Sequence, residues 1–249
     1  MTPNDSSSQA ALKRQADQLS RDLGLTLEAF LGRAVSLHIA SGEQHLTIAP
    51  PQGEYLSLSI RGRTLLSLEL SYRCHFDHRQ QYLAVKQSHL KVHAGHRPHG
   101  DPLFRYEYVH EQQGQLPSAH LHVHGHRDQF TRVMTLAGEA GVPRRKPDAL
   151  DSAEVARMAK LHFPLGGPRF RPCLEDVLQM VQIELGVDTG PDWPSRLNAA
   201  RANYRRQQTG AVVRDCPAEA VRVLRELGYE VSDPPGGAHP ERLDRLQAF

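Results

Sequence analysis

The chain has 249 residues, of which 39% are hydrophobic and 23% charged, a composition that indicates a globular protein and excludes an intrinsically disordered one. Its formal net charge of +2 excludes a strong overall attraction to nucleic acid or to an anionic membrane, and leaves only local basic patches for such ligands. The three cysteines, Cys74, Cys173 and Cys216, are too few and too widely spaced for a disulfide framework or a thiolate zinc site.

The N-terminal region, residues 1–34, predicts two helices. From Gln9 onward, apolar residues recur at the three- and four-residue spacing of an amphipathic helix: Leu12, Ala16, Leu19 and Leu23. Gly24 is expected to end this helix, since glycine favours the position just past a helix C-terminus. Thr26 is then placed to cap a short second helix over residues 27–33.

From Val35 the apolar period changes from about 3.6 to 2, which is the pattern of half-buried strands. The strands are short, lie close together in the sequence and have no helix between them, so hairpins must connect them and the sheet must be antiparallel. The sequence therefore predicts a β-meander with strands over 35–39, 45–48, 55–60, 64–73, 81–92, 103–110 and 119–127.

After Phe130 helices replace strands in the prediction. A capping box at 151–154 opens a short helix to about Lys160, and residues 173–185 form an amphipathic helix with Pro172 in its first turn. Two further helices are predicted over 194–213 and 217–227. The predicted fold class is α+β, an antiparallel β-meander with flanking helices and a helical C-terminal region. The regions are 1–34 (N-terminal helices), 35–190 (sheet domain with a closing helix) and 191–249 (C-terminal helices and a loose tail).

Histidine is the unusual residue of this chain. Of its 15 histidines, 11 lie between His75 and His126. On the predicted strand 119–127, four of them alternate with apolar residues and so share one face: His120, His122, His124 and His126. Imidazole can act near pH 7 as an acid, a base, a nucleophile or a metal ligand. We therefore treat this strand as a candidate site, with a row of solvated histidines on an exposed sheet face as the alternative of equal weight.

Two known chemistries use histidines at this spacing. An HxH pair on a strand can supply two nitrogen ligands to zinc or another transition metal, but the sequence identifies no third ligand, so neither a metal site nor a cofactor is predicted. The segment from Gln115 to His124 also resembles the signature of the histidine-triad hydrolases, in which the central histidine, here His122, attacks phosphorus. Gly125 and His126 depart from that signature, as does the spacing from Gln115 to His120, so kinship with those hydrolases is disfavoured.

A glycine- and arginine-rich loop precedes the helix at 173–185. Backbone N–H groups at a glycine pair and the start of a helix both favour anions, and two arginines one residue apart can clamp a phosphate or carboxylate. The candidate anion site consists of Gly166, Gly167, Arg169 and Arg171. The alternative is that Phe163, Leu165 and Phe170 dock this segment onto the sheet.

Three short segments resemble the TumE-type bacterial toxin family: Phe104–Glu107, the histidines from His120 to His126, and Leu174–Leu178. The resemblance covers interrupted pieces of residues 55–185, and Glu107 stands where the family usually has aspartate. It implies a toxin of a toxin–antitoxin pair that acts on RNA, with Arg105, His120, His122 and His124 as the catalytic candidates.

The leading functional hypothesis is therefore a toxin-type endoribonuclease whose strand histidines act as acid and base. Its partners would be an antitoxin or another protein, and RNA. The alternatives are a non-enzymatic interaction module, with the arginine-rich region 196–206 as its contact surface, and a metal- or nucleotide-dependent hydrolase. The N-terminus has no apolar core of signal-peptide type, and no segment approaches the roughly 18 apolar residues of a membrane helix, so we expect a cytoplasmic location and no membrane association.

Overall fold

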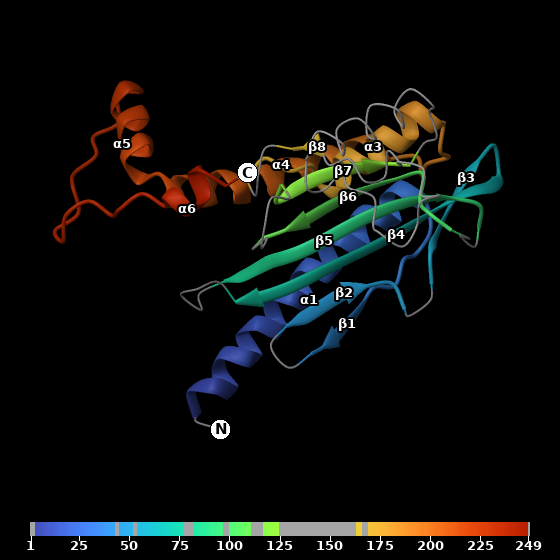
Figure 1. The fold of residues 1–249 in the computed structure, drawn as a ribbon, viewed down its shortest axis with the longest axis horizontal. Helices are drawn as coiled ribbons and strands as arrows, with labels where there is room; N and C mark the ends of the chain where they lie inside the picture. The colour runs from blue at the N-terminus through green and yellow to red at the C-terminus, as the bar shows by residue number, and fades with distance from the viewer. Residues whose placement is uncertain are drawn as a thin grey trace, which may run out of the picture.

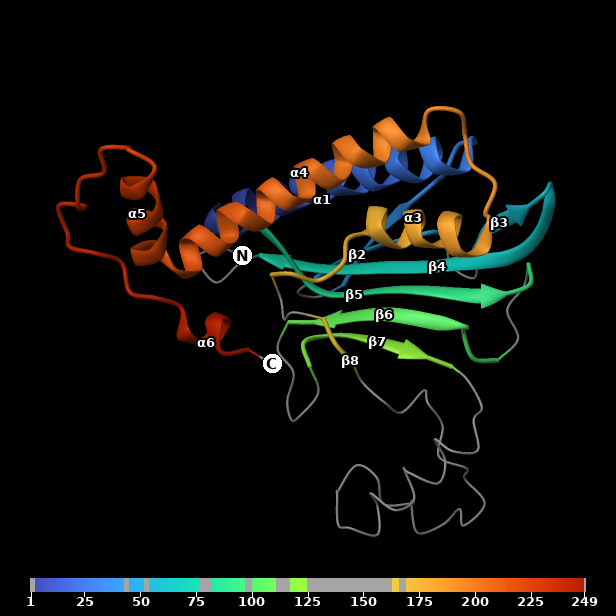
Figure 2. The ribbon, with the colours of Figure 1, turned by 90° about the horizontal axis from the view of Figure 1, so that it is seen from above.

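The fold is an antiparallel β-sheet with helices packed against one face (Figures 1 and 2), which confirms the predicted α+β class with flanking helices and a helical C-terminal region. The computed structural model describes residues 3–42, 45–51, 54–76, 82–96, 100–110, 117–124, 163–165 and 169–248. Within these ranges no helix combines the length and the apolar character that crossing a membrane requires.

The N-terminal region forms one continuous helix, α1 (Pro3–Leu31), so the prediction that Gly24 separates two helices is wrong. Leu27 and Phe30 continue the buried stripe that includes Leu23, and both are fully buried. Burial of that stripe outweighs the cost of about 1 kcal/mol that glycine adds inside a helix. The helix ends instead at Gly32, whose φ of 66° is the left-handed conformation that glycine favours.

The sheet is organised around one long strand. Its strands are β1 (His38–Ser41), β2 (Leu46–Ala49), β3 (Leu56–Ile60), β4 (Arg63–Phe76), β5 (Leu83–Ala94), β6 (Phe104–Val109), β7 (Ala119–Val123) and β8 (Phe163–Pro164). Their order across the sheet is β1-β2-β4-β5-β6-β7-β8, with β3 also paired to β4. All of these pairs are antiparallel. The meander is therefore regular from β4 onward.

The order departs from a simple meander at β2, which pairs with β4 instead of β3. The 14 residues of β4 are long enough for two partners along one edge. β3 pairs with residues 63–68 of β4, and β2 pairs with residues 72–74. β5 occupies the other edge over residues 66–76, which places β6 and β7 beyond it.

The main hydrophobic core lies between the sheet and the helices α1, α3 (Leu174–Leu185) and α4 (Trp193–Asp215). Figure 2 shows α1 and α4 side by side over this face of the sheet. Alternate residues of β4 and β5 face the core, and the helices meet them with a set of fully buried side chains: Leu27, Phe30, Leu174, Val177, Leu178 and Leu197. This one core thus contains residues from each of the three predicted regions.

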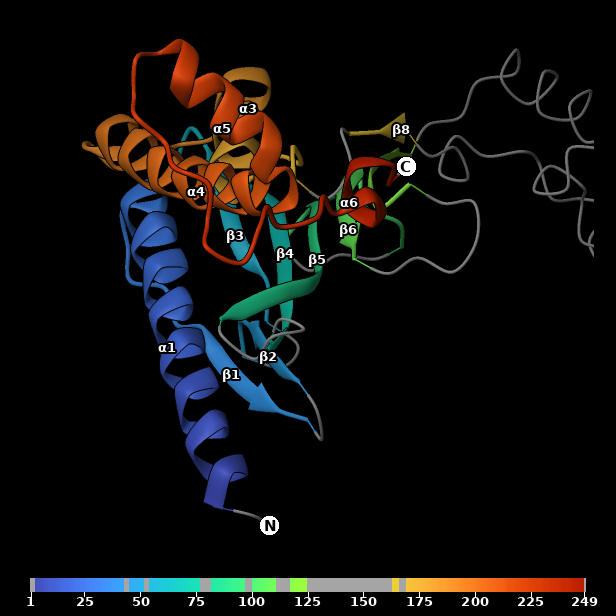
Figure 3. The same cartoon turned by 90° about the vertical axis from the view of Figure 1, so that its left-hand side faces the viewer.

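The helices predicted over 173–185, 194–213 and 217–227 are present, with ends within two residues of the predicted ones. A short helix that was not predicted forms over Leu243–Leu246, in the segment expected to be a loose tail. In α3, Cys173 is the N-cap and its backbone N–H donates to Asp176, so Pro172 precedes the cap and does not lie in the first turn. α4 is followed by α5 (Pro217–Glu226) and α6 (Leu243–Leu246). Figure 3 shows α6 beside the end of β6, where Arg245 contacts His110. The helix predicted over 151–160 lies outside the described residues.

Candidate functional site

The face of the sheet opposite the helices carries a concentration of polar and ionisable side chains, which we call the polar face. In β4 to β7 these residues alternate with core residues such as Leu68, Leu70, Leu90 and Tyr106. The polar face comprises Ser67, Glu69, Ser71, Arg73, Gln87, His89, Lys91, His93, Arg105, Glu107, His120 and His122. His120 and His122 of the predicted histidine row therefore point away from the helices, as their alternation with apolar residues predicted.

The register between β6 and β7 brings the candidate residues together. Arg105 is paired with His122 and Glu107 with His120. On the other side of β6, Glu107 is paired with His89 of β5. Side chains of directly paired residues on one face are neighbours, so this register places an arginine, a carboxylate and three histidines in one patch.

At the centre of the patch, one carboxylate oxygen meets two imidazoles. Glu107 Oε2 lies 3.2 Å from Nε2 of His120 and 3.1 Å from Nε2 of His122. Nε of Arg105 lies 3.4 Å from the same oxygen. Both histidines are 3% exposed, so these contacts are screened from bulk water. We call Glu107, His120 and His122 the Glu107 cluster.

The backbone fixes the tautomer of His120. Its Nδ1 lies 2.8 Å from the carbonyl oxygen of Pro117, and because a carbonyl oxygen only accepts hydrogen bonds, Nδ1 must carry the proton. In a neutral imidazole, Nε2 then presents a lone pair, and that atom is the one that faces Glu107. The contact is attractive only when a proton or another cation lies at Nε2.

The ionisation of Glu107 is strongly favoured. Burial opposes ionisation, but hydrogen bonding to His120 and His122 and the positive charge of Arg105 outweigh it and hold the pKa of this carboxyl well below its ordinary value. The cluster therefore keeps a negative charge at its centre throughout the physiological pH range.

A cavity of about 440 Å³ lies over this part of the polar face. Residues of the Glu107 cluster line it together with basic and polar side chains of β4 to β6: Ser71, Arg73, Gln87, His89 and Arg105. Because Arg73 and Arg105 both line this space, an anionic group that entered it would meet two guanidinium groups close to the cluster.

A second cluster occupies the adjoining strands of the polar face. Glu69 Oε1 lies 2.8 Å from Nζ of Lys91 and 3.0 Å from Nε2 of His89, and Oε2 lies 3.4 Å from Nε2 of His93. The hydrogen bond from His89 lowers the pKa of Glu69 to about 2, with burial opposing this shift and Lys91 adding to it. This Glu69 cluster contains its own cation, the ammonium of Lys91.

We expect Glu69→Gln to remove a pH-dependent part of the stability. Because the folded-state pKa of Glu69, about 2, is below its ordinary value of 4.5, its ionised form stabilises the fold above pH 4.5. That contribution is lost as the pH falls from 4.5 to about 2. Urea unfolding should show the variant about 1–3 kcal/mol less stable than the wild type at neutral pH, with the difference shrinking across this acid window. A constant difference from neutral to acid pH would contradict this account.

His124 does not belong to the Glu107 cluster. It follows the last residue of β7, and its Nδ1 lies 3.5 Å from Asp101. Burial lowers the pKa of His124, with Asp101 opposing the shift. His126, the fourth histidine of the predicted row, lies outside the described residues.

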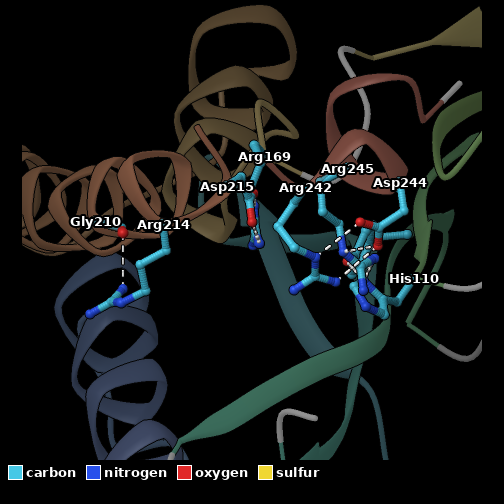
Figure 4. Close-up of polar contacts among 9 residues, drawn as sticks. His110, Arg169, Gly210, Arg214, Asp215, Arg242, Asp244 and Arg245 are labelled. Atoms are coloured by element: carbon cyan, nitrogen blue, oxygen red, sulfur yellow. Dashed lines mark hydrogen bonds and ion pairs between the residues drawn. The ribbon is translucent and has the colours of Figure 1, made fainter. Parts of the chain in front are cut away.

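The predicted anion-site arginines, Arg169 and Arg171, lie on the other side of the sheet from His120 and His122. Arg169 Nε lies 2.5 Å from Oδ2 of Asp215, and Nη2 lies 3.1 Å from Oδ1, so this arginine is held in a two-point ion pair (Figure 4). The guanidinium carbon of Arg171 lies 3.8 Å above the ring centre of Tyr108. Gly166 and Gly167 are outside the described residues. Phe170 is 75% exposed, so the alternative that it docks the segment onto the sheet is wrong for this residue.

Both arginines line a large cavity, about 1720 Å³, between the helices and the sheet. Arg242 and Arg245 also line this cavity, where Arg242 is paired with Asp244 and Arg245 contacts His110 (Figure 4). In the arginine-rich region of α4, Arg201 is also structural, because its Nε donates to Asp176 Oδ1 at 2.8 Å. The contacts of Arg169 with Asp215, Arg201 with Asp176 and Arg245 with His110 tie the C-terminal helices to the sheet domain.

Sequence reasoning missed the central role of Glu107. It lies two residues after Arg105, so the two share a face, and that spacing was visible in the sequence. What the sequence did not show was the strand register that places Glu107 opposite His120. Glu107 is therefore the third group that the HxH pair appeared to lack.

Comparisons with known proteins give no family for this chain. A scan against family models, a search of curated proteins and a search of solved structures each found no match. The resemblance to the TumE-type toxins stays a hypothesis based on short motifs. Functional inference therefore depends on the geometry of the polar face.

Proposed function

We propose that the protein is a toxin-type enzyme that cleaves phosphodiester bonds in RNA, with the Glu107 cluster and Arg105 as its active site. One observation carries this proposal: the register of β6 and β7 sets Arg105 opposite His122 and Glu107 opposite His120. A cation suited to phosphate and a cluster that can bind a proton thus lie side by side below one cavity.

Cleavage of a phosphodiester requires a group that activates the attacking oxygen and a cation that stabilises the charge developing on the phosphate. Arg105 is suited to the second role, because its planar guanidinium can bind two phosphate oxygens and its side chain is 30% exposed. The Glu107 cluster is suited to the first role. The three strand histidines would then not act as independent acids and bases, since His120 and His122 share one carboxylate and His124 lies outside the cluster.

A toxin of this type would act on cytoplasmic RNA and would be held inactive by an antitoxin.

The C-terminal region also has a surface that is suited to binding a protein partner. None of the residues of α5 is buried, and large apolar side chains are exposed on and after it: Val223, Leu224, Leu227 and Tyr229. This surface supports the second candidate function, a non-enzymatic interaction module, which would require no chemistry at the polar face.

RNA cleavage by the purified, untagged chain distinguishes the two functions. We expect cleavage of a labelled RNA, measured with and without added divalent ions, and growth arrest when the chain is expressed alone. Arg105→Gln should lower kcat/KM by about 10- to 100-fold, because it removes the cation beside the cluster. The matched control Arg63→Gln, at an exposed position at the start of β4, should leave kcat/KM unchanged. An intact wild-type chain that cleaves no RNA under either condition would eliminate the enzymatic proposal and leave the interaction module.

A further inference from the structure

Three potential metal-ligating atoms converge in the Glu107 cluster. One atom from each of Glu107, His120 and His122 lies within 4.8 Å of the other two. The carboxylate oxygen is 3.2 Å and 3.1 Å from the two imidazole nitrogens. A tetrahedral ion with bonds of about 2.0–2.1 Å holds its ligand atoms about 3.3 Å apart, so these two separations already fit such an ion.

The orientation of His120 supports a cation at this point. Its Nδ1 donates to the Pro117 carbonyl oxygen, and its Nε2 faces the carboxylate. Metal-bound histidines commonly have this arrangement, in which a backbone carbonyl or a carboxylate accepts the N–H of the other ring nitrogen. A single proton can join only two of the three converging atoms, whereas a metal ion can join all three.

We propose that Glu107, His120 and His122 bind one divalent transition-metal ion. Two imidazoles and one carboxylate suit zinc and neighbouring first-row ions better than Mg²⁺ or Ca²⁺, which prefer oxygen ligands. Three protein ligands leave a coordination position open, as in catalytic sites and unlike structural zinc sites. The site deepens the proposed function, because a metal at this position would activate water or polarise a phosphate oxygen. Only this role depends on the proposed function; the binding site itself does not.

The positive charge of Arg105 affects how tightly the site binds a metal ion. The Nε atom of Arg105 lies 3.4 Å from Glu107 Oε2, so the guanidinium charge repels a metal ion that enters the cluster. An anion that bound both the metal and Arg105 would relieve this repulsion. We therefore expect inorganic phosphate to tighten metal binding to the wild-type protein, and to have a smaller effect on Arg105→Gln.

The Glu69 cluster supplies a matched comparison on the same face. It also joins one glutamate to two histidines, His89 and His93, but Lys91 contacts Glu69 at 2.8 Å. Among the described residues only the Glu107 cluster brings three ligand atoms within 4.8 Å of one another, so the Glu69 cluster should not bind a metal. Substitutions of Glu69 and His93, neither of which lines the cavity over the Glu107 cluster, therefore test whether metal binding depends on the specific geometry of that cluster or only on the histidine content of the chain.

The test uses untagged protein, stripped with a chelator and titrated with Zn²⁺ by calorimetry, and with Co²⁺ by visible absorption. We expect one tight ion per chain and the absorption of Co²⁺ in a low-symmetry site. His122→Ala and Glu107→Gln should each weaken Zn²⁺ binding by about 100-fold or more, whereas Glu69→Gln and His93→Ala should leave it unchanged. Circular dichroism of every variant confirms that it is folded.

Two results would overturn the site: no tight Zn²⁺ or Co²⁺ binding by folded wild-type protein, or tight binding that survives both His122→Ala and Glu107→Gln. The cleavage assay separates this inference from the proposed function. RNA cleavage by chelator-stripped protein would show that catalysis needs no metal, and the proposed ribonuclease activity would still hold. Specific metal binding without RNA cleavage would establish the metal site and would contradict the proposed ribonuclease function.

Discussion

We expect Glu107→Gln to lower kcat/KM for RNA cleavage by about 1,000-fold. The substitution keeps the size and shape of the side chain but removes the negative charge that His120, His122 and Arg105 share. A group that activates a nucleophile typically contributes about 10²- to 10⁴-fold to the rate. The loss should appear as a decrease in kcat, because the phosphate-binding Arg105 remains in place.

Glu69→Gln is the matched control for this experiment. It makes the same chemical change on the same face, in a cluster that lies one strand pair away and contains Lys91. We expect its cleavage rate to stay within about twofold of the wild type, since this cluster takes no part in activating the nucleophile. Equal losses in the two variants would show that the whole face, and not the Glu107 cluster, governs activity.

The largest effect on stability is expected for Asp215→Ala. Asp215 is 4% exposed and accepts two hydrogen bonds from Arg169 at the end of α4. Its removal leaves the guanidinium of Arg169, which is 23% exposed, without its counter-ion. Breaking one partner of a buried ion pair typically costs about 3–5 kcal/mol, and we expect a loss of about 3 kcal/mol in the free energy of unfolding, measured in urea.

Asp244→Ala provides the comparison for this loss. Its carboxylate also bonds an arginine, Arg242, but its side chain is 55% exposed. Exposed ion pairs contribute about 0–1 kcal/mol, so this variant should unfold close to the wild type. If Asp215→Ala were as stable as Asp244→Ala, the Arg169–Asp215 pair would not hold the C-terminal helices to the sheet.

Alternating hydrophobicity predicted the strands and the shared face of His120 and His122, because a period of two residues has only one structural meaning on a half-buried strand. The continuity of α1 was missed because local preference at Gly24 was weighed without the packing of Leu27 and Phe30. The pairing of β2 with β4 was missed for a related reason. It depends on the length of β4 and on which of its edges is free, which are properties of the assembled sheet.

The candidate site was only partly predictable for the same physical reason. Arg105 and the histidines were identified from residue type, but their proximity and the role of Glu107 depend on strand register. Conversely, Arg169 and Arg171 seemed suited to join the histidines, yet they lie on the helix-covered side. Residue type indicates what a side chain can do, whereas the side of the sheet on which a loop returns is decided by tertiary packing.

The contact between His120 and Pro117 has a consequence for the rate at which a metal ion can bind to the site. The two residues are only three positions apart in the sequence, so a local hydrogen bond orients the ring. The His120 nitrogen that would bind a metal ion therefore already points into the cluster, and little rearrangement should precede metal binding. Association at such a site should be limited by access to the cavity, and a slow conformational phase should be absent from rapid-mixing traces.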